Sequence, residues 1–442
     1  MEKDRNNLVL YTTAVCNLKC RYCYIDKNPA LVTIDNILDE SFKGDYYFNF
    51  AKELFLKDCL TTVQIWGGEP SLRLDRAYYT IEKLIEYYPN LSNFMTSTNF
   101  TYSKWDEQFY GLLKVLGKFP NRHFHFQLQL SIDGPKYIND NGRGEGVTDL
   151  FIKNFDNMID TIDDNLPKNV DLVWMFKPTL DTSTIRLLDT KEKIIEYYQF
   201  FETFYDKMQF KKNLKNFGFD PSIPNTACPS PHTKEDGILF AKFCKMCKEI
   251  ETENRKTHKY FKYYQGIIPY RSRKVPDKVS YNCAGGTCGT GKNVVGLLPN
   301  HMISACHNGF VDLVSDYKNA SANNKDSSLD FTFFAKNRQT KMTMTVDEFK
   351  NYEKQIEYYY LPGTKARLAN IASLINLLAR VGQVDEKYQD RKEALRAAHF
   401  MQYCAAYCIR DNYNSTGSIS LYPVGLLKLL LNGAREYCEE DV

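Results

Sequence analysis

The sequence predicts an α/β fold: a partial parallel (β/α)6 barrel followed by a C-terminal α+β domain that is rich in cysteine. Three observations support this prediction. Strand-like and helix-like patterns alternate from about residue 7 to about residue 220. Short polar motifs follow several of the strand-like runs. Further cysteines recur beyond residue 280, after the alternating part of the chain.

Six strand and helix units account for the barrel. Short apolar runs predict strands at residues 8–13, 62–66, 91–96, 124–132, 170–176 and 214–219. Apolar residues at intervals of three and four predict helices at 75–88, 105–116, 148–162 and 191–208. Loops beyond the carboxyl ends of the strands build the active sites of barrels of this kind. We therefore expect a functional site at that edge, where the polar motifs fall.

Cys16, Cys20 and Cys23 form the most informative motif, with three and then two residues between them. Three thiolates at this spacing can bind three irons of a cube-shaped iron–sulfur cluster and leave the fourth iron open to another ligand. With 13 cysteines among 442 residues, one such pattern is expected by chance roughly 0.01 times. A structural zinc site is the alternative that this spacing leaves open.

Other motifs follow the next predicted strands in turn. They are Gly67-Gly68-Glu69-Pro70, Thr98-Asn99, Ser131-Ile132-Asp133-Gly134-Pro135, and Arg143. The first follows the strand at 62–66, the second follows the strand at 91–96, and the third follows the alternating run at 124–130. Two adjacent glycines let the backbone approach a ligand closely. Taken singly, each motif could be an ordinary turn, and Arg143 could be a solvated cation.

Together and in this order, the motifs resemble those of the radical S-adenosylmethionine (radical SAM) enzymes. The resemblance implies that the glycine motif contacts the amino group of SAM, that Ser131 and Arg143 lie near its ribose and carboxylate, and that Tyr22 flanks its adenine. The implied SAM-binding residues are Tyr22, Gly67, Gly68, Glu69, Pro70, Thr98, Asn99, Ser131 and Arg143. The chain departs from the family pattern at Phe100, where glycine is frequent, and at Asn139-Asp140, where His-Asp is frequent.

The last third resembles the opening of the SPASM or twitch extension, in which a cysteine, a hairpin and a second cysteine bind another 4Fe-4S cluster. Strand-like runs at 293–298 and 302–305 predict the hairpin, and His301 occupies a position where the family usually has glycine. The resemblance implies at least one auxiliary cluster, with the candidate ligands Cys283, Cys288, Cys306, Cys404 and Cys408. Core packing is the alternative for Cys404 and Cys408, which lie four apart in a helical segment.

We therefore expect three parts: a radical SAM barrel at 1–220, a bridging segment at 221–280, and a SPASM/twitch-like auxiliary iron–sulfur domain with a helical insertion at 281–442. The bridge contains a helical pattern at 235–253, in which Cys244 and Cys247 share one face and could bind a metal or pack in a core. In the last part, Thr345 and Glu348 form a capping box that predicts a helix start. Of the other cysteines, Cys228 is unassigned, and Cys59 and Cys438 are interpreted as structural.

The composition indicates a folded protein without features of export. Hydrophobic residues make up 43% of the chain and aromatic residues 14%, which suffices for sizeable cores. The N-terminal residues contain no apolar signal segment, and no stretch approaches the ~20 apolar residues of a membrane span. We expect a cytoplasmic protein without membrane contact, in which the high cysteine content indicates metal ligands rather than disulfides. A net charge of +3 gives no broad basic surface for nucleic acid.

The resemblance also implies an activity. A radical SAM enzyme uses one electron from a 4Fe-4S cluster to cleave SAM into methionine and a 5′-deoxyadenosyl radical, which abstracts hydrogen from a substrate. A flavodoxin or ferredoxin is implied as the electron donor. Because the motif set is similar to that of sulfatase maturases and enzymes that modify ribosomally made peptides, we expect a peptide or protein substrate.

Two alternatives stay open. The first is radical SAM modification of RNA or of a small molecule, although the chain contains no recognisable RNA-binding module. The second is a non-catalytic binding protein stabilised by metal, which would not need the SAM motifs. No catalytic acid or base is assigned, since Asp133, Asp220 and Asp236 are acids without a recognised partner in the sequence.

Overall fold

The computed structural model describes residues 6–23, 30–208, 216–219, 234–254, 294–299, 301–304, 343–348, 365–401, 427–428 and 431–432. The chain divides into two compact units. The first comprises Met1–Lys177, Thr203–Gly218 and Thr290–Glu353, and the second comprises Pro178–Glu202, Phe219–Gly289 and Lys354–Val442. The three cysteines of the N-terminal motif belong to the first unit.

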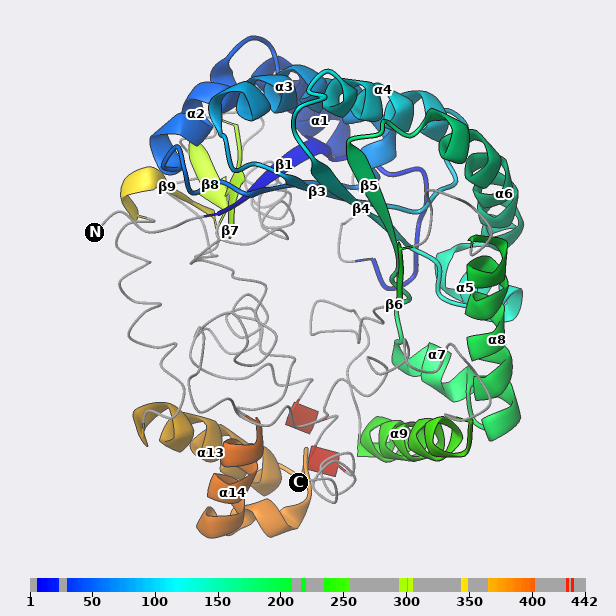
Figure 1. Ribbon diagram of the computed structural model, residues 1–442. Coiled ribbons are helices and arrows are strands. Elements are labelled where there is room, and N and C mark those ends of the chain that lie inside the picture. Colours follow the sequence, from blue (N-terminus) through cyan, green and yellow to red (C-terminus); the bar gives the residue numbers. More distant parts are fainter. Residues whose placement is uncertain are drawn as a thin grey trace. The chain divides into compact units, whose positions relative to one another are not determined.

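A nine-stranded sheet forms the centre of the first unit (Figure 1), with the strand order β6-β5-β4-β3-β2-β1-β7-β8-β9. The strands are β1 Asn7–Thr13, β2 Thr62–Gly67, β3 Asn93–Thr98, β4 Phe124–Leu130, β5 Val170–Phe176, β6 Asn216–Phe219, β7 Val294–Leu297, β8 Met302–Ser304 and β9 Thr343–Thr345. The strands from β1 to β5 pair in parallel, each with the next along the chain. The predicted α/β class is confirmed, and all six predicted barrel strands are present.

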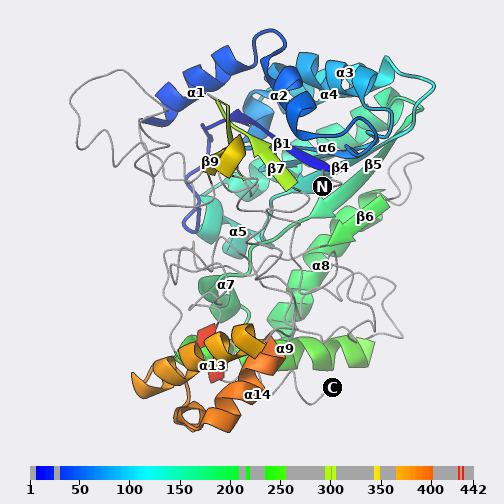
Figure 2. The same cartoon turned by 90° about the vertical axis from the view of Figure 1, so that its left-hand side faces the viewer.

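Helices connect these strands. They are α1 Ala30–Ser41, α2 Tyr46–Leu54, α3 Tyr78–Tyr87, α4 Trp105–Gly117, α5 Lys136–Arg143, α6 Val147–Asn165 and α8 Lys191–Met208. In Figure 1, α2, α3, α4 and α6 follow one another along the outer face of the sheet, and Figure 2 shows α2, α3 and α4 on that same side of β1. The predicted helices match α3, α4, α6 and α8, whereas α1, α2 and α5 were not predicted from the sequence.

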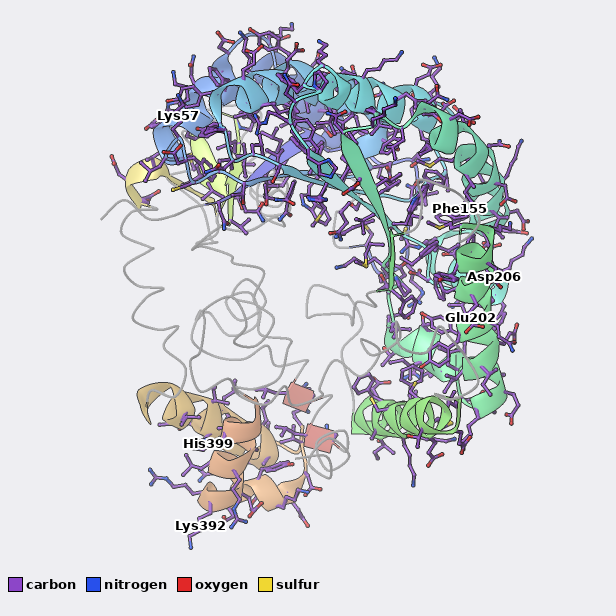
Figure 3. The ribbon with its side chains drawn as sticks, in the orientation of Figure 1. Lys57, Phe155, Glu202, Asp206, Lys392 and His399 are labelled. Carbon is purple, nitrogen blue, oxygen red and sulfur yellow. The ribbon has the colours of Figure 1, made fainter. Side chains whose placement is uncertain are left out.

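Aromatic side chains fill the space between α6 and the sheet. Phe155 of α6 is fully buried, and its ring centroid lies 5.5 Å from that of Trp174 in β5 and 4.8 Å from that of Phe204 in α8 (Figure 3). Alternate residues of β5 are buried, so one face of this strand packs against these rings. Contacts of this size and geometry contribute strongly to the stability of a core.

The predicted C-terminal hairpin is present, and it extends the main sheet. β7 pairs in parallel with β1, with Val294 opposite Asn7, and β8 pairs antiparallel with β7. β1 therefore has neighbours on both sides, which agrees with the burial of its residues 8–13. The capping box is also confirmed: the N–H of Thr345 donates to Oε2 of Glu348 at 2.9 Å, and the N–H of Glu348 donates to Oγ1 of Thr345 at 3.3 Å.

In the second unit, the structure describes mainly helices. They are α7 Thr182–Leu187, α9 Lys234–Asn254, α13 Lys365–Arg380 and α14 Arg391–Met401, together with part of α8. Asp236 of α9 accepts a hydrogen bond from Arg186 of α7 at 2.5 Å, which gives this acid a structural partner. Cys244 and Cys247 are fully buried on α9. Among the described helices of the whole chain, none is long and apolar enough to cross a membrane.

Phe100 and His301 are the two non-glycine residues with a positive φ among those that the structure describes, at 60° and 58°. This conformation costs a residue with a Cβ atom about 1–2 kcal/mol, and at both positions the sequence resemblances led us to expect glycine. Each side chain makes contacts that offset the strain. Phe100 is buried with its ring centroid 4.4 Å from that of Trp105, and the exposed His301 stacks at 4.4 Å on Phe50 and pairs with Glu53 at 3.3 Å.

Glycine at these two positions should have unequal effects on stability. His301→Gly relieves backbone strain and removes an exposed ring, so we expect the free energy of unfolding to change by less than about 1 kcal/mol. Phe100→Gly removes a buried ring, a loss of about 3–5 kcal/mol that strain relief offsets only in part, so we expect a net destabilisation of about 2–4 kcal/mol. Urea unfolding measures both changes, and equal effects would contradict this account.

Candidate functional site

A segment without regular secondary structure, residues 14–23, follows β1 and contains Cys16, Cys20 and Cys23. We call this segment the cysteine loop. All three cysteines are partly exposed, and the N–H of Cys23 donates to the carbonyl oxygen of Cys20 at 3.1 Å. Since β1 to β5 are parallel, their carboxyl ends lie at one edge of the sheet. At this edge, the cysteine loop makes hydrogen bonds with the segments that follow β2, β3 and β4.

The segment after β3 contacts the first part of the cysteine loop. Nδ2 of Asn99 donates to Oδ1 of Asn17 at 2.8 Å and lies 3.8 Å from Sγ of Cys16. Nδ2 of Asn17 in turn donates to Oγ1 of Thr101 at 2.9 Å. The backbone N–H of Leu18 also donates to Sγ of Cys16, at 3.4 Å. Two N–H donors at one sulfur stabilise the thiolate, which is the form that binds metal.

The segment after β2 lies directly against the cysteine loop. The N–H groups of Gly68 and Glu69 donate to the carbonyl oxygens of Thr13 and Val15, both at 2.9 Å. A Cβ atom on Gly67 would lie 2.3 Å from the oxygen of Thr13, and one on Gly68 would lie 2.4 Å from the oxygen of Val15. The sequence suggested that these glycines let the backbone approach a ligand. In the structure, Gly67 lets the backbone approach the last residue of β1, and Gly68 lets it approach the cysteine loop.

Glu69 is buried, and its carboxylate joins the segments that follow β2 and β3. Oε1 accepts a hydrogen bond from the N–H of Ser71 at 3.1 Å, and Oε2 accepts one from the N–H of Asn99 at 2.7 Å. Burial raises the pKa of Glu69 above its usual value, while the hydrogen bonds from Asn99 and Ser71 oppose this rise. The carboxylate therefore fixes the backbone of Asn99, whose side chain lies beside Cys16.

A buried ion pair follows β4. Nε of Arg143 donates to Oδ2 of Asp133 at 3.0 Å, and Nη2 donates to Oδ1 at 2.8 Å. The Asp133 side chain is fully buried, and that of Arg143 is 7% exposed. The hydroxyl of Tyr22 donates to the same carboxylate, and the guanidinium lies 5.5 Å from the centre of the Tyr22 ring. With the hydrogen bond from the N–H of Arg21 to the carbonyl oxygen of Gly142, at 2.8 Å, these contacts fix the second half of the cysteine loop.

Burial determines how this group of three side chains is protonated. It raises the pKa of Tyr22 well above the usual value, although the charge of Arg143 opposes the rise, so the phenol remains a hydrogen-bond donor. Burial is the largest single effect and would lower the pKa of Arg143, but the charges of Asp133, Tyr22 and Cys20 and the hydrogen bond to Asp133 together raise it above its usual value. The guanidinium is therefore charged, and Asp133, for which the sequence offered no partner, has two.

The start of the cysteine loop is bonded by residues that the sequence analysis missed. Asp35 of α1 accepts hydrogen bonds from the hydroxyl of Thr13 and from the N–H of Ala14, the latter at 3.0 Å. Its other oxygen pairs at 3.0 Å with Arg76, whose side chain is 3% exposed and also donates to the carbonyl oxygen of Thr12 at 2.8 Å. For Arg76, the one available signal in the sequence was a charged residue within the helix predicted at 75–88. The sequence does not show that this side chain is buried.

The structure thus brings together the motifs predicted from the first half of the chain. Ser131 joins them at the end of β4, where it is half-buried and its N–H donates to the carbonyl oxygen of Thr98 at 2.9 Å. The other predicted residues at this edge are Tyr22, Gly67, Gly68, Glu69, Pro70, Asn99 and Arg143. The candidate auxiliary ligands Cys283, Cys288, Cys306, Cys404 and Cys408 lie outside the described residues, as do Cys228, Cys438 and Asp220.

The three thiols of the cysteine loop are donors of the kind that hold an iron–sulfur cluster. They are partly exposed, they lie on one ten-residue segment, and Cys16 receives N–H donors from Leu18 and Asn99. Hydrogen bonds to cluster sulfurs of this kind tune the reduction potential of such clusters.

Comparison with known proteins supports the fold. No protein family model matches the chain, and no curated protein matches its sequence. Two similar solved structures are described as native anSMEcpe with bound AdoMet and a peptide, Cp18Cys in one and Kp18Cys in the other. Each is 15% identical with a TM-score of 0.50, and each match covers 98% of this chain and 99% of the other. anSMEcpe is a radical SAM anaerobic sulfatase-maturating enzyme. The chain shares the fold of these two structures.

Asp133→Asn should destabilise the protein by about 3–5 kcal/mol, because it leaves the buried Arg143 cation without its counter-charge. Adding Arg143→Met should recover part of that loss. The matched control is Asp149→Asn. Asp149 pairs with Lys136, and the two side chains are 64% and 59% exposed, so the loss of this pair should cost less than about 1 kcal/mol. Denaturant unfolding under anaerobic conditions compares the variants, and equal losses for Asp133 and Asp149 would contradict the prediction.

Proposed function

We propose that the chain is a radical SAM enzyme that modifies a peptide or protein substrate. One observation carries the proposal: Cys16, Cys20 and Cys23 lie on a loop at the carboxyl edge of the parallel strands, where hydrogen bonds join it to the motifs after β2, β3 and β4. A metal-stabilised binding protein would need the three cysteines. It would not need the buried polar contacts that fix them against these particular segments.

In this proposal, Cys16, Cys20 and Cys23 hold a 4Fe-4S cluster. Such a cluster, when bound, supplies the one electron that cleaves SAM into methionine and a 5′-deoxyadenosyl radical, which takes a hydrogen atom from the substrate. The chain's own residues orient the reactants and exclude water, which is the usual contribution of the protein in cofactor enzymes.

The proposed SAM-binding residues are Tyr22, Gly67, Gly68, Glu69, Pro70, Thr98, Asn99, Ser131 and Arg143. Asp133 occupies Nε and Nη2 of Arg143, so the remaining N–H groups of the guanidinium are the proposed donors to the carboxylate of SAM. The same ion pair holds Tyr22, the proposed neighbour of the adenine, through its hydroxyl. Ser131 offers a hydroxyl to the ribose.

A peptide or protein is the proposed substrate class, because solved structures with the same fold hold a peptide together with AdoMet. We further propose that residues 281–442 hold at least one auxiliary 4Fe-4S cluster, with ligands among Cys283, Cys288, Cys306, Cys404 and Cys408. In the same proposal, residues 221–280 link this part to the barrel at 1–220. A flavodoxin or ferredoxin would supply the electron in the cytoplasm.

The first test is cleavage of SAM. Anaerobically reconstituted protein with dithionite should form 5′-deoxyadenosine, and replacing Cys16, Cys20 and Cys23 together by alanine should abolish this product, because no other cysteine of the barrel follows the motif. Cys59→Ala is the matched control, since Cys59 is partly exposed and lies outside the cysteine loop. Product above background in the triple variant would refute the assignment of the cluster.

The second test counts iron. With one auxiliary 4Fe-4S cluster, the chain should carry about eight iron atoms, and Cys404→Ala/Cys408→Ala should carry clearly fewer. That variant should still form 5′-deoxyadenosine, because cleavage of SAM needs only the cysteine loop, but it should lose conversion of a peptide substrate. About four iron atoms in the unmodified chain, with no loss in the variant, would show that Cys404 and Cys408 are not ligands.

A further inference from the structure

A second group of metal-binding side chains lies at the opposite edge of the same sheet. His123 directly precedes β4, His125 is the second residue of β4, and Asp171 is the second residue of β5. These are the amino-terminal ends of the strands, whereas Ser131 and the cysteine loop lie at the carboxyl ends. Ser131 lies six positions after His125 along the strand, or about 20 Å of extended chain, so the two sites do not share ligands.

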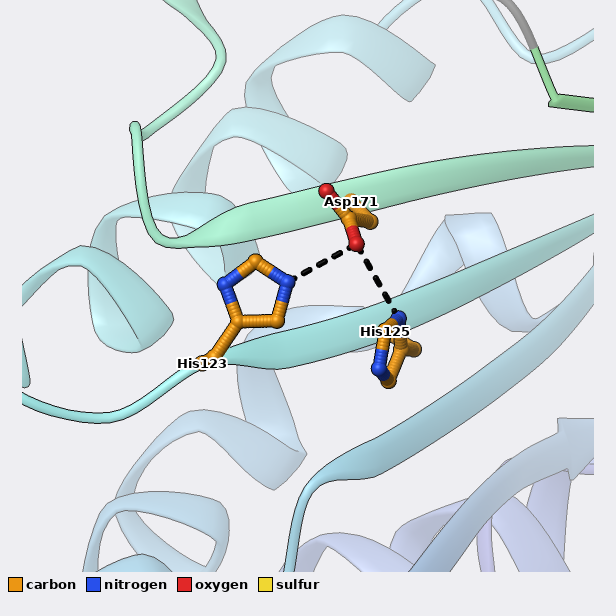
Figure 4. Close-up of side chains that lie close together, drawn as sticks. All are labelled: His123, His125 and Asp171. Carbon is orange, nitrogen blue, oxygen red and sulfur yellow. Dashed lines mark hydrogen bonds and ion pairs between the residues drawn. The ribbon is translucent and has the colours of Figure 1, made fainter.

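The ligand atoms of this group converge. Oδ2 of Asp171 lies 2.8 Å from Nε2 of His123 and 3.2 Å from Nδ1 of His125, and all three ligand atoms lie within 4.8 Å of one another. Figure 4 shows both imidazoles directed at the same carboxylate oxygen. Among the residues that the structure describes, these three form the one group of histidine, cysteine or acidic side chains whose ligand atoms converge in this way.

The packing of the sheet enforces this arrangement. Phe124 and Phe126 of β4 are fully buried, so the alternation of a strand turns His123 and His125 outward together. Asp171 lies between the buried residues Val170 and Leu172 and points outward for the same reason.

The pairing of the strands places the carboxylate beside the imidazoles. His125 and Asp171 are direct partners in the parallel register of β4 and β5. A slip of this register would expose the buried phenylalanines, so the three side chains are held together by the core and not by their own attraction.

We propose that His123, His125 and Asp171 bind one divalent cation of the zinc class. Two imidazole nitrogens and one carboxylate oxygen are ligands that Zn²⁺ accepts in proteins, at about 2.0–2.2 Å. A tetrahedral site with such bonds has ligand atoms about 3.3 Å apart, close to the 2.8 and 3.2 Å between the carboxylate oxygen and the two nitrogens. The three side chains are 45–55% exposed, so the fourth position is open to water. The cation would cross-link the amino ends of β4 and β5.

Zinc binding by the cluster-loaded protein tests the proposal. After equilibration with micromolar Zn²⁺ and desalting, the unmodified chain should retain one zinc more than His123→Ala/His125→Ala. Asp171→Asn should weaken zinc binding by more than roughly 10-fold. Replacing a residue that only hydrogen-bonds to a metal ligand already costs about this much, and Asp171 is a proposed ligand itself. The matched control His301→Ala removes another exposed histidine and should bind zinc like the unmodified chain.

X-ray absorption at the zinc edge separates this site from zinc held by cysteines. The zinc lost in the double variant should have nitrogen and oxygen neighbours at about 2.0–2.2 Å and no sulfur at about 2.3 Å. Equal zinc in the unmodified chain and the double variant, or a sulfur shell for the difference, would overturn the proposal. If the double variant does not fold, Asp171→Asn and the spectrum of the unmodified chain decide. Formation of 5′-deoxyadenosine should be unchanged in all variants, so failure of the proposed enzyme activity and failure of this site are distinguishable.

Discussion

Parallel pairing of β1 to β5 is the constraint on which the candidate site depends. It places the carboxyl ends of the strands at one edge, so segments far apart in the sequence become neighbours of the cysteine loop. The loop has no helix or strand pairing of its own and takes its shape from these neighbours. Glu69 bonds its start, Asn99 bonds its first half, and Asp133 bonds its second half through Tyr22.

The buried charged groups at this edge orient the segments around the cysteine loop more than they stabilise the fold. Asp133, Glu69 and Arg76 are nearly inaccessible to solvent, and each has partners that compensate for the loss of water. Such groups add little net stability compared with well-packed apolar residues. Their hydrogen bonds have fixed directions, however, and so they orient the segments that contact the cysteine loop.

The sequence allowed the strands and the motifs to be predicted because both depend on local pattern. Alternating and continuous apolar runs located all six barrel strands, and the capping box at Thr345 formed as expected. The partners of Asp133 could not be predicted, since burial and not spacing selects Arg143 and Tyr22 from the many polar residues nearby. The partners of Asp35, and the backbone that Gly67 and Gly68 approach, could not be predicted either. These contacts depend on which segments are neighbours across the sheet, and local composition does not show this.

The pairing of β1 with β7 has a consequence for synthesis of the chain. Val294 lies opposite Asn7, so β1 receives its second neighbour only after about 290 further residues have been made. At roughly 5–20 residues per second, a ribosome needs about 15–60 s to reach that point. Until β7 has been made, β1 lacks this partner, and an unpaired strand edge has open backbone donors and acceptors that are prone to pairing with other chains. One edge of the first strand thus stays open to other chains long after that strand has left the ribosome.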